Sequence, residues 1–183
     1  ENNRVNNEKL DTSEKFNFQL LADSNKDSIS AVALIRAYRL RGHLLANLDP
    51  LEMRESDYLD ELHPEFYGFK KQNYDKKIFL NGVINKKYAN IKEILKFLKK
   101  TYCGNIGYEF MHVSNPVERK WFRDRVEQDQ NALNFTKNGK EAILNKLVQA
   151  EGFEKFLATK YVGTKRFGLD GGESLIPALE QII

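Results

Sequence analysis

The chain has few of the residues that build small extracellular folds. Among its 183 residues there is one cysteine, Cys103, and there are only four prolines. One cysteine excludes an intrachain disulfide, so we expect a reducing compartment: the bacterial cytoplasm or the mitochondrial matrix. No apolar run approaches the ~18 residues that a membrane span needs, so no membrane partner is expected.

The sequence also has little excess charge of either sign. Its 29 Lys and Arg residues against 26 Asp and Glu residues give a net charge of +3. Nucleic-acid-binding proteins concentrate basic residues on one stripe of their surface. The near balance of charges here does not indicate a nucleic-acid partner. The lysine-rich stretch at residues 86–100 has few aromatic residues on its polar side, which favours a solvated helix face.

Several chemistry-bearing patterns are absent. The three histidines, His43, His63 and His112, have no second Cys or His at ligand spacing, so no metal site is expected. Glycine-rich dinucleotide and phosphate loops are missing as well. Cys103 could be a nucleophile or a small buried apolar residue. Because the negative end of a helix disfavours thiolate, the second interpretation is favoured.

What is present is typical of a soluble helical protein, with 41% hydrophobic and 30% charged residues. The patterns predict a mainly α fold, an irregular helical domain of about five to seven helices with long loops and at most a short strand or two. We expect a flexible arm or linker over residues 1–26 and a helical domain over 27–160. Residues 161–183 are expected to be a glycine-rich loop and a truncated helix, because an amphipathic pattern that stops at Ile182 and Ile183 looks cut. The chain is therefore interpreted as an internal piece of a longer protein.

Local signals predict where single elements begin and end. Apolar residues at helical spacing predict a helix from Asp27 that stops at Asp49 and Pro50. Asn90, followed three residues later by Glu93, forms a capping-box pattern at the start of another helix. A short β-prone stretch at residues 108–113 is compatible with a brief strand.

The second half of the chain carries further helix signals. Asn115 and Pro116 are typical of an N-cap and a first helical position, and Thr136 begins another helical stretch. Gly152 is expected to kink or break that stretch. A last helix is expected after Ser174.

Two groups of residues are candidates for binding. Arg36, Arg39 and His43 fall on one helical face, where they either grip an anion or acidic partner or form ordinary salt bridges. The second group is the glycine-rich stretch at residues 164–172. There Arg166 can bind a carboxylate or phosphate through two parallel hydrogen bonds, and Phe167 supplies a flat apolar wall. The alternative for this stretch is an ordinary surface loop.

Blocks of sequence from residue 27 to residue 183 resemble those of one enzyme family, in that family's order. The blocks are LIRAYRLRGHL at 34–44, LDPL at 48–51, EFYGF at 65–69, TYCGNIG at 101–107, EFMH at 109–112, EGFEKFL at 151–157, KRF at 165–167 and GGESLIP at 171–177. The family is the first, decarboxylating component of 2-oxoglutarate dehydrogenase, which depends on thiamine diphosphate.

The resemblance implies that the chain is the helical region that precedes the cofactor-binding domains of this family. It implies a full-length homodimer that uses thiamine diphosphate and Mg²⁺, takes 2-oxoglutarate and passes a succinyl group to the dihydrolipoyl succinyltransferase component. The cofactor- and metal-binding motifs of the family would lie beyond Ile183. The resemblance therefore implies no catalytic, cofactor or metal residue within this chain, and we expect the chain to be inactive alone.

The resemblance implies one contribution to the substrate site. In the family the Lys-Arg-Phe segment approaches the substrate, so Phe167 and Arg166 would line that pocket as substrate-binding residues. The usual family pattern after this Phe is Ser-Leu-Glu-Gly, whereas this chain has Gly168, Leu169, Asp170 and Gly171. A competing interpretation is a non-catalytic helical module for protein interactions.

Overall fold

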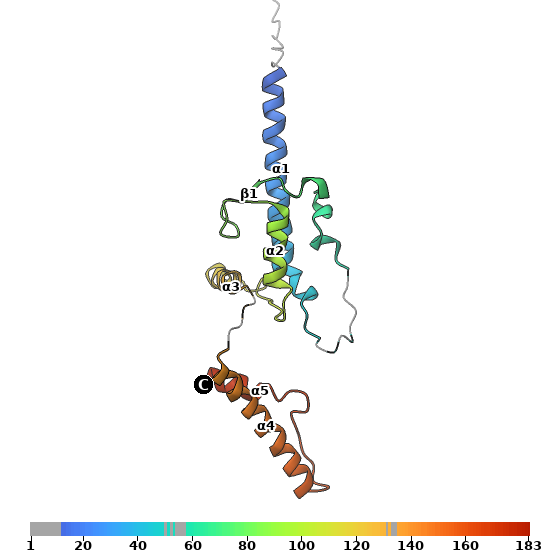
Figure 1. Ribbon diagram of the computed structural model, residues 1–183, viewed down its shortest axis with the longest axis vertical. Coiled ribbons are helices and arrows are strands. Elements are labelled where there is room, and N and C mark those ends of the chain that lie inside the picture. Colours follow the sequence, from blue (N-terminus) through green and yellow to red (C-terminus); the bar gives the residue numbers. More distant parts are fainter. Residues whose placement is uncertain (1–11, 50, 52, 54–57, 131, 133–134) are drawn as a thin grey trace, which may run out of the picture. The chain divides into compact units, whose positions relative to one another are not determined.

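Helices make up most of the chain, as the sequence predicts (Figure 1). The computed structural model describes residues 12–49, 51, 53, 58–130, 132 and 135–183, with side chains from residue 19 onward. These residues contain five α-helices and one two-stranded sheet, which confirms the mainly α fold class. The elements are α1 (Thr12–Arg41), β1 (Ile78–Phe79), β2 (Tyr88–Ala89), α2 (Ile91–Tyr102), α3 (Pro116–Asp129), α4 (Lys137–Lys160) and α5 (Leu175–Ile182).

The chain divides into two compact units, Glu1–Ala132 and Leu133–Ile183. This division falls before α4, whereas the sequence suggests a boundary after residue 160. The reason is that the segment after α4 turns back and forms hydrogen bonds with that helix, so both belong to one unit. None of the described helices combines the length and the apolar character needed to cross a membrane.

Helix α1 begins at Thr12, earlier than the expected start at Asp27. Residues 12–26, expected to be part of an arm, contain neither proline nor glycine, so the helix can extend through them from its packed half. Residues 19–26 are exposed, and burial begins at Ala31. Residues 1–11 of the expected arm lie outside the described residues. The helix ends at Arg41 and is followed by a 3₁₀ turn at Gly42–Leu45, before the predicted stop.

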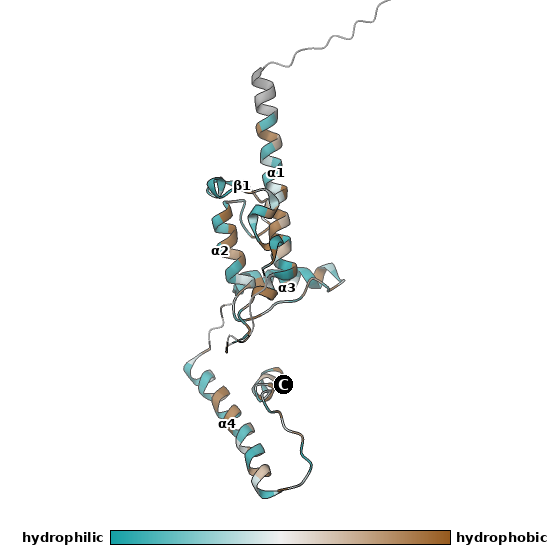
Figure 2. Cartoon of the chain, turned by 90° about the vertical axis from the view of Figure 1, so that its right-hand side faces the viewer, coloured by the Kyte–Doolittle hydropathy of each residue, from teal (hydrophilic) through white to brown (hydrophobic). Residues whose placement is uncertain are grey.

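Helix α2 packs its apolar stripe into the core of the first unit, beside α1 (Figures 1 and 2). The predicted capping box is confirmed: the backbone N–H of Glu93 donates to Asn90 Oδ1 at 2.9 Å, and the N–H of Asn90 donates to Glu93 Oε2 at 3.2 Å. The lysines of α2 are exposed, as expected of a solvated face. The buried side chains of the helix are Ile91, Ile94, Leu98, Thr101 and Tyr102.

The two strands form an antiparallel hairpin in which Ile78 pairs with Ala89 and Phe79 with Tyr88. The sequence analysis missed this hairpin, because strands of two residues leave too short a pattern. The brief strand with which residues 108–113 are compatible does not form. That segment has no partner strand among the described residues; it turns at 111–112, and the N–H of Val113 donates to the carbonyl of Phe110, which is buried in the core.

The later helices begin where the sequence predicts. Asn115 Oδ1 accepts the N–H of Val117 at the start of α3, and Thr136 Oγ1 accepts the N–H of Gly139 at the start of α4. Of the kink or break expected at Gly152, the break does not occur, because α4 continues through this residue. A glycine within a helix costs only about 1 kcal/mol, which a helix of 24 residues tolerates.

Gly42 has a packing role that Gly152 lacks. A Cβ at Gly42 would lie 2.6 Å from Tyr102 Cβ, in the core, whereas a Cβ at Gly152 would meet nothing within 4 Å. Gly42→Ala is therefore expected to lower the free energy of unfolding by about 1–3 kcal/mol through overpacking. The matched control, Gly152→Ala, should raise it by about 0.5–1 kcal/mol. Urea denaturation of both variants measures the two effects, and equal signs would contradict this packing argument.

Candidate functional site

The loop that carries Arg166 and Phe167 is attached to the end of α4. Arg166 Nη1 donates to the backbone carbonyls of Leu157, at 3.2 Å, and Tyr161, at 2.7 Å. Carbonyls at the C-terminal end of a helix carry partial negative charge, so a guanidinium there is stabilising. This use of Arg166 differs from the one predicted from the sequence, in which the guanidinium binds a carboxylate or phosphate.

A second attachment follows three residues later in the loop. The backbone N–H of Leu169 donates to Glu154 Oε1 at 2.6 Å. Glu154 lies within α4, 15 residues earlier in the chain. Sequence reasoning did not identify Glu154 as part of the site, since nothing local marks which acidic residue of a helix will meet a later loop.

Phe167 lies between these two attachments and is 89% exposed. The ammonium of Lys165 lies 5.2 Å from the centre of the Phe167 ring, a cation–π arrangement. Arg166 uses only Nη1 in the hydrogen bonds of the described residues, which leaves Nε and Nη2 available. The structure thus presents a largely exposed aromatic ring and, on the preceding residue, a guanidinium with two nitrogens outside these hydrogen bonds.

A pocket of about 410 Å³ lies between this loop and α4. Four carboxylates and two cations line it, so an anion would meet net negative charge there. Arg166 and Phe167 both line this pocket, and the Phe167 ring is largely exposed to solvent. The lining residues are Glu151, Glu154, Lys155, Leu157, Ala158, Thr164, Arg166, Phe167, Gly168, Asp170 and Glu173.

Three of these carboxylates, on Glu154, Asp170 and Glu173, have oxygens within 4.8 Å of one another. Two of the three already accept backbone hydrogen bonds: Glu154 from Leu169, and Glu173 from the N–H of Gly171 at 3.2 Å. Gly171 has a positive φ of 82°, which glycine adopts without strain. The acidic group is thus accounted for as part of the turn that leads into α5.

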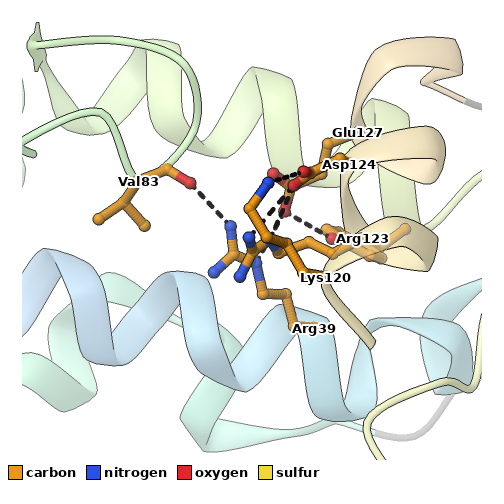
Figure 3. A network of polar contacts seen from close by, with 7 residues as sticks. Arg39, Val83, Lys120, Arg123, Asp124 and Glu127 are labelled. Atoms are coloured by element: carbon orange, nitrogen blue, oxygen red, sulfur yellow. Dashed lines mark hydrogen bonds and ion pairs between the residues drawn. The ribbon is translucent and has the colours of Figure 1, made fainter. Parts of the chain in front are cut away.

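The other predicted group, Arg36, Arg39 and His43, does not form one binding face. Arg39 points into the first unit, where its Nε donates to Glu127 Oε1 at 2.7 Å and its Nη2 donates to the carbonyl of Val83 at 2.8 Å (Figure 3). Arg36 is exposed, and His43 Nε2 lies 3.5 Å from Glu109 Oε1. The salt-bridge alternative therefore holds for Arg39, whose charge is used inside the fold.

Glu127 joins three helices at this point. The Tyr102 hydroxyl also donates to Glu127 Oε1, at 2.8 Å, so α1, α2 and α3 meet at one carboxylate oxygen. Burial, and then the charge of Glu127, raise the pKa of Tyr102 and keep it protonated as a donor. Burial alone would lower the pKa of Arg39, but the hydrogen bond and charge of Glu127 outweigh that effect and raise it.

Cys103 is not suited to nucleophilic chemistry. Its thiol lies 3.5 Å from the carbonyl of Gly42, and burial raises the pKa of the thiol to about 11. At neutral pH the thiolate that would react is therefore scarce. This favours the packing interpretation of Cys103.

Comparison with known proteins gives consistent matches. The 2-oxoglutarate dehydrogenase E1 components of Brucella anthropi, Brucella canis and Brucella suis are each 56% identical to the chain over 165 residues. The aligned part covers 89% of the chain, and the chain spans only 16% of the length of these relatives. No protein-family model matches the chain. The resemblance of the sequence blocks is nevertheless confirmed: the chain shares a segment of sequence with the 2-oxoglutarate dehydrogenase E1 family.

Proposed function

We propose that this chain is a helical part of a 2-oxoglutarate dehydrogenase decarboxylating subunit, a component of the tricarboxylic acid cycle. That subunit oxidatively decarboxylates 2-oxoglutarate and transfers the succinyl group to a lipoyl domain. The observation that carries the proposal is the 56% identity to E1 components over 165 residues. The mainly helical fold agrees with a supporting part of a larger enzyme.

Within that enzyme the chain would act as a scaffold and form one wall of the substrate site. Phe167 and Arg166 are the residues proposed to line it. The exposed ring of Phe167 suits the methylene groups of 2-oxoglutarate, and the remaining donors of Arg166 suit a carboxylate. Lys165, next to the same ring, adds a second cation on this side.

The described residues do not fit the cofactor itself. Thiamine diphosphate supplies the electron sink for decarboxylation when it is bound. Its diphosphate needs cations or free backbone amides, whereas the pocket below the loop has an excess of carboxylates. We therefore propose that thiamine diphosphate and Mg²⁺ are held by other parts of the full-length protein.

Both units carry exposed apolar side chains, which indicates that other protein surfaces cover them. In α3, the rings of Trp121 and Phe122 lie 5.1 Å apart and both are exposed. Apolar groups in such numbers are commonly covered by other protein surfaces. We propose that further parts of a homodimeric cytoplasmic enzyme, which binds the dihydrolipoyl succinyltransferase component, cover them. In the second unit the exposed apolar residues include Leu144, Val148, Phe153, Phe156, Leu179 and Ile182.

These same surfaces favour a second candidate function, a non-catalytic helical interaction module. The two candidates differ in what the full-length protein does. With thiamine diphosphate and Mg²⁺, the full-length protein is expected to release CO₂ from 2-oxoglutarate, and the 183-residue chain alone is expected to release none. Release of labelled CO₂ from carboxyl-labelled 2-oxoglutarate measures both.

The outcomes of this assay separate the candidates. A full-length protein that binds partners but does not release CO₂ would favour the interaction module. Release of CO₂ by the chain alone would contradict the proposed scaffold role.

A further inference from the structure

Phe167 has no packing of its own to fix its position. Its side chain is 89% exposed, so the direction of the ring depends on the backbone that carries it. That backbone is held on the N-terminal side by Arg166, which binds the carbonyls at the end of α4. On the C-terminal side it is held by Glu154, which accepts the N–H of Leu169.

Of these two contacts, the one with Glu154 involves the residue that directly follows Phe167, Gly168. A Cβ at Gly168 would lie 2.9 Å from Glu154 Oε2 and 3.2 Å from Glu154 Cδ, so the carboxylate lies directly against this part of the backbone. Its other oxygen takes the Leu169 N–H at 2.6 Å, a short hydrogen bond to a charged acceptor. One side chain of a regular helix thus fixes two consecutive residues of the loop.

We propose that Glu154 is a positioning residue that holds Phe167 in place as a wall of the substrate site. This inference rests on the proposed function of Phe167. Glu154 touches neither the ring of Phe167 nor, on this account, the substrate. It acts through the backbone of Gly168 and Leu169, because a rigid helix is a better support than a free loop.

The hydrogen bond can be tested without any activity. In the full-length protein, Glu154→Ala should increase amide hydrogen exchange in residues 164–172, measured by mass spectrometry, while exchange in α4 before residue 150 stays unchanged. Glu154→Gln should keep most of the protection, because its amide oxygen can still accept the Leu169 N–H. Unchanged exchange in the alanine variant would overturn the proposal.

The kinetic consequence separates positioning from general stability. Glu154→Ala should lower kcat/KM for 2-oxoglutarate by about tenfold, since small misplacements of a site residue have effects of that size. Glu154→Gln should restore most of the loss. The double variant Glu154→Ala/Phe167→Ala should be no worse than Phe167→Ala alone, because both changes remove the same wall. The matched control is Glu141→Ala, which removes an exposed acidic side chain of α4 that forms an ion pair with Lys137 and should leave kcat/KM unchanged.

The kinetic outcomes separate the role of Phe167 from that of Glu154. A normal kcat/KM in Phe167→Ala would contradict the proposed role of Phe167. If Phe167→Ala is impaired but Glu154→Ala is normal, or the two losses multiply in the double variant, the positioning role of Glu154 is overturned. Should the alanine variant not fold, Glu154→Asp serves in its place, because its carboxylate is set back by one methylene and cannot reach Leu169. A wild-type kcat/KM in that variant would equally overturn the proposal.

Discussion

Replacing Arg39 by methionine is expected to lower the free energy of unfolding of the first unit by about 3–5 kcal/mol. The side chains of Arg39 and Glu127 are only 12% and 3% exposed, so neither charge is well solvated in the fold. Removing the guanidinium would leave the Glu127 carboxylate buried without its cation, and the carbonyl of Val83 without its donor. Methionine preserves most of the length of the side chain, so the loss reports the missing charge more than a cavity. Urea denaturation followed by circular dichroism measures it.

Three further variants identify the cause of this loss. Glu127→Leu alone should also be strongly destabilising, because it leaves a buried cation. In Arg39→Met/Glu127→Leu both charges are gone, so the double variant should recover an interaction energy of about 1–3 kcal/mol relative to the sum of the single losses. Arg36→Met, on an exposed position of the same helix, should change stability by about 0.5 kcal/mol or less. A loss in Arg39→Met as small as that of Arg36→Met would contradict the buried pair.

Elements whose signals are local in sequence were predicted well. The capping box at Asn90 and Glu93, and the caps at Asn115 and Thr136, depend on residues within three positions of each other, and all three caps form. The apolar stripe of α2 likewise follows from helical spacing alone. Where local signals are weak or permissive, the predictions failed. Gly152 is compatible with a break in the helix but does not require one, and residues 12–26 lack any residue that would stop the helix.

Features that depend on distant pairs could not be predicted from the sequence. Arg39 and Glu127 are 88 positions apart, and the acidic residue that would meet Arg39 cannot be selected among many in a charged segment. The same limit applies to the loop. Arg166 and Phe167 are candidates both from their residue types and from the family resemblance, but the contacts of Arg166 with the end of α4 depend on how the chain turns back at residues 161–164.

Phe167→Ala in the full-length protein is expected to lower kcat/KM for 2-oxoglutarate by about 10- to 100-fold. In the proposed function the ring packs against the methylene groups of the substrate. Without the ring, the bound substrate is held less firmly in the orientation needed for reaction. The melting temperature should not change, because a side chain that is 89% exposed in this unit contributes little to its core. Phe167→Leu keeps an apolar surface without the flat ring. Its kcat/KM should therefore lie between that of the unaltered protein and that of Phe167→Ala.

Val162→Ala is a matched control for this variant. Val162 is 83% exposed, lies five residues earlier in the same segment after α4, and is not proposed to face the substrate. Its kinetics and melting temperature should both equal those of the unaltered protein. A loss of kcat/KM in Val162→Ala as large as that in Phe167→Ala would mean that shortening any side chain of this segment impairs the enzyme, and the effect would not be specific to Phe167.

The most direct test of the proposed substrate wall is therefore one paired measurement on Phe167→Ala: kcat/KM for 2-oxoglutarate and the melting temperature of the same preparation. The account predicts a loss of at least about tenfold in kcat/KM at an unchanged melting temperature. A lowered melting temperature with unchanged kinetics would contradict it, because Phe167 would then be a packing residue of the full-length protein and not part of its substrate site.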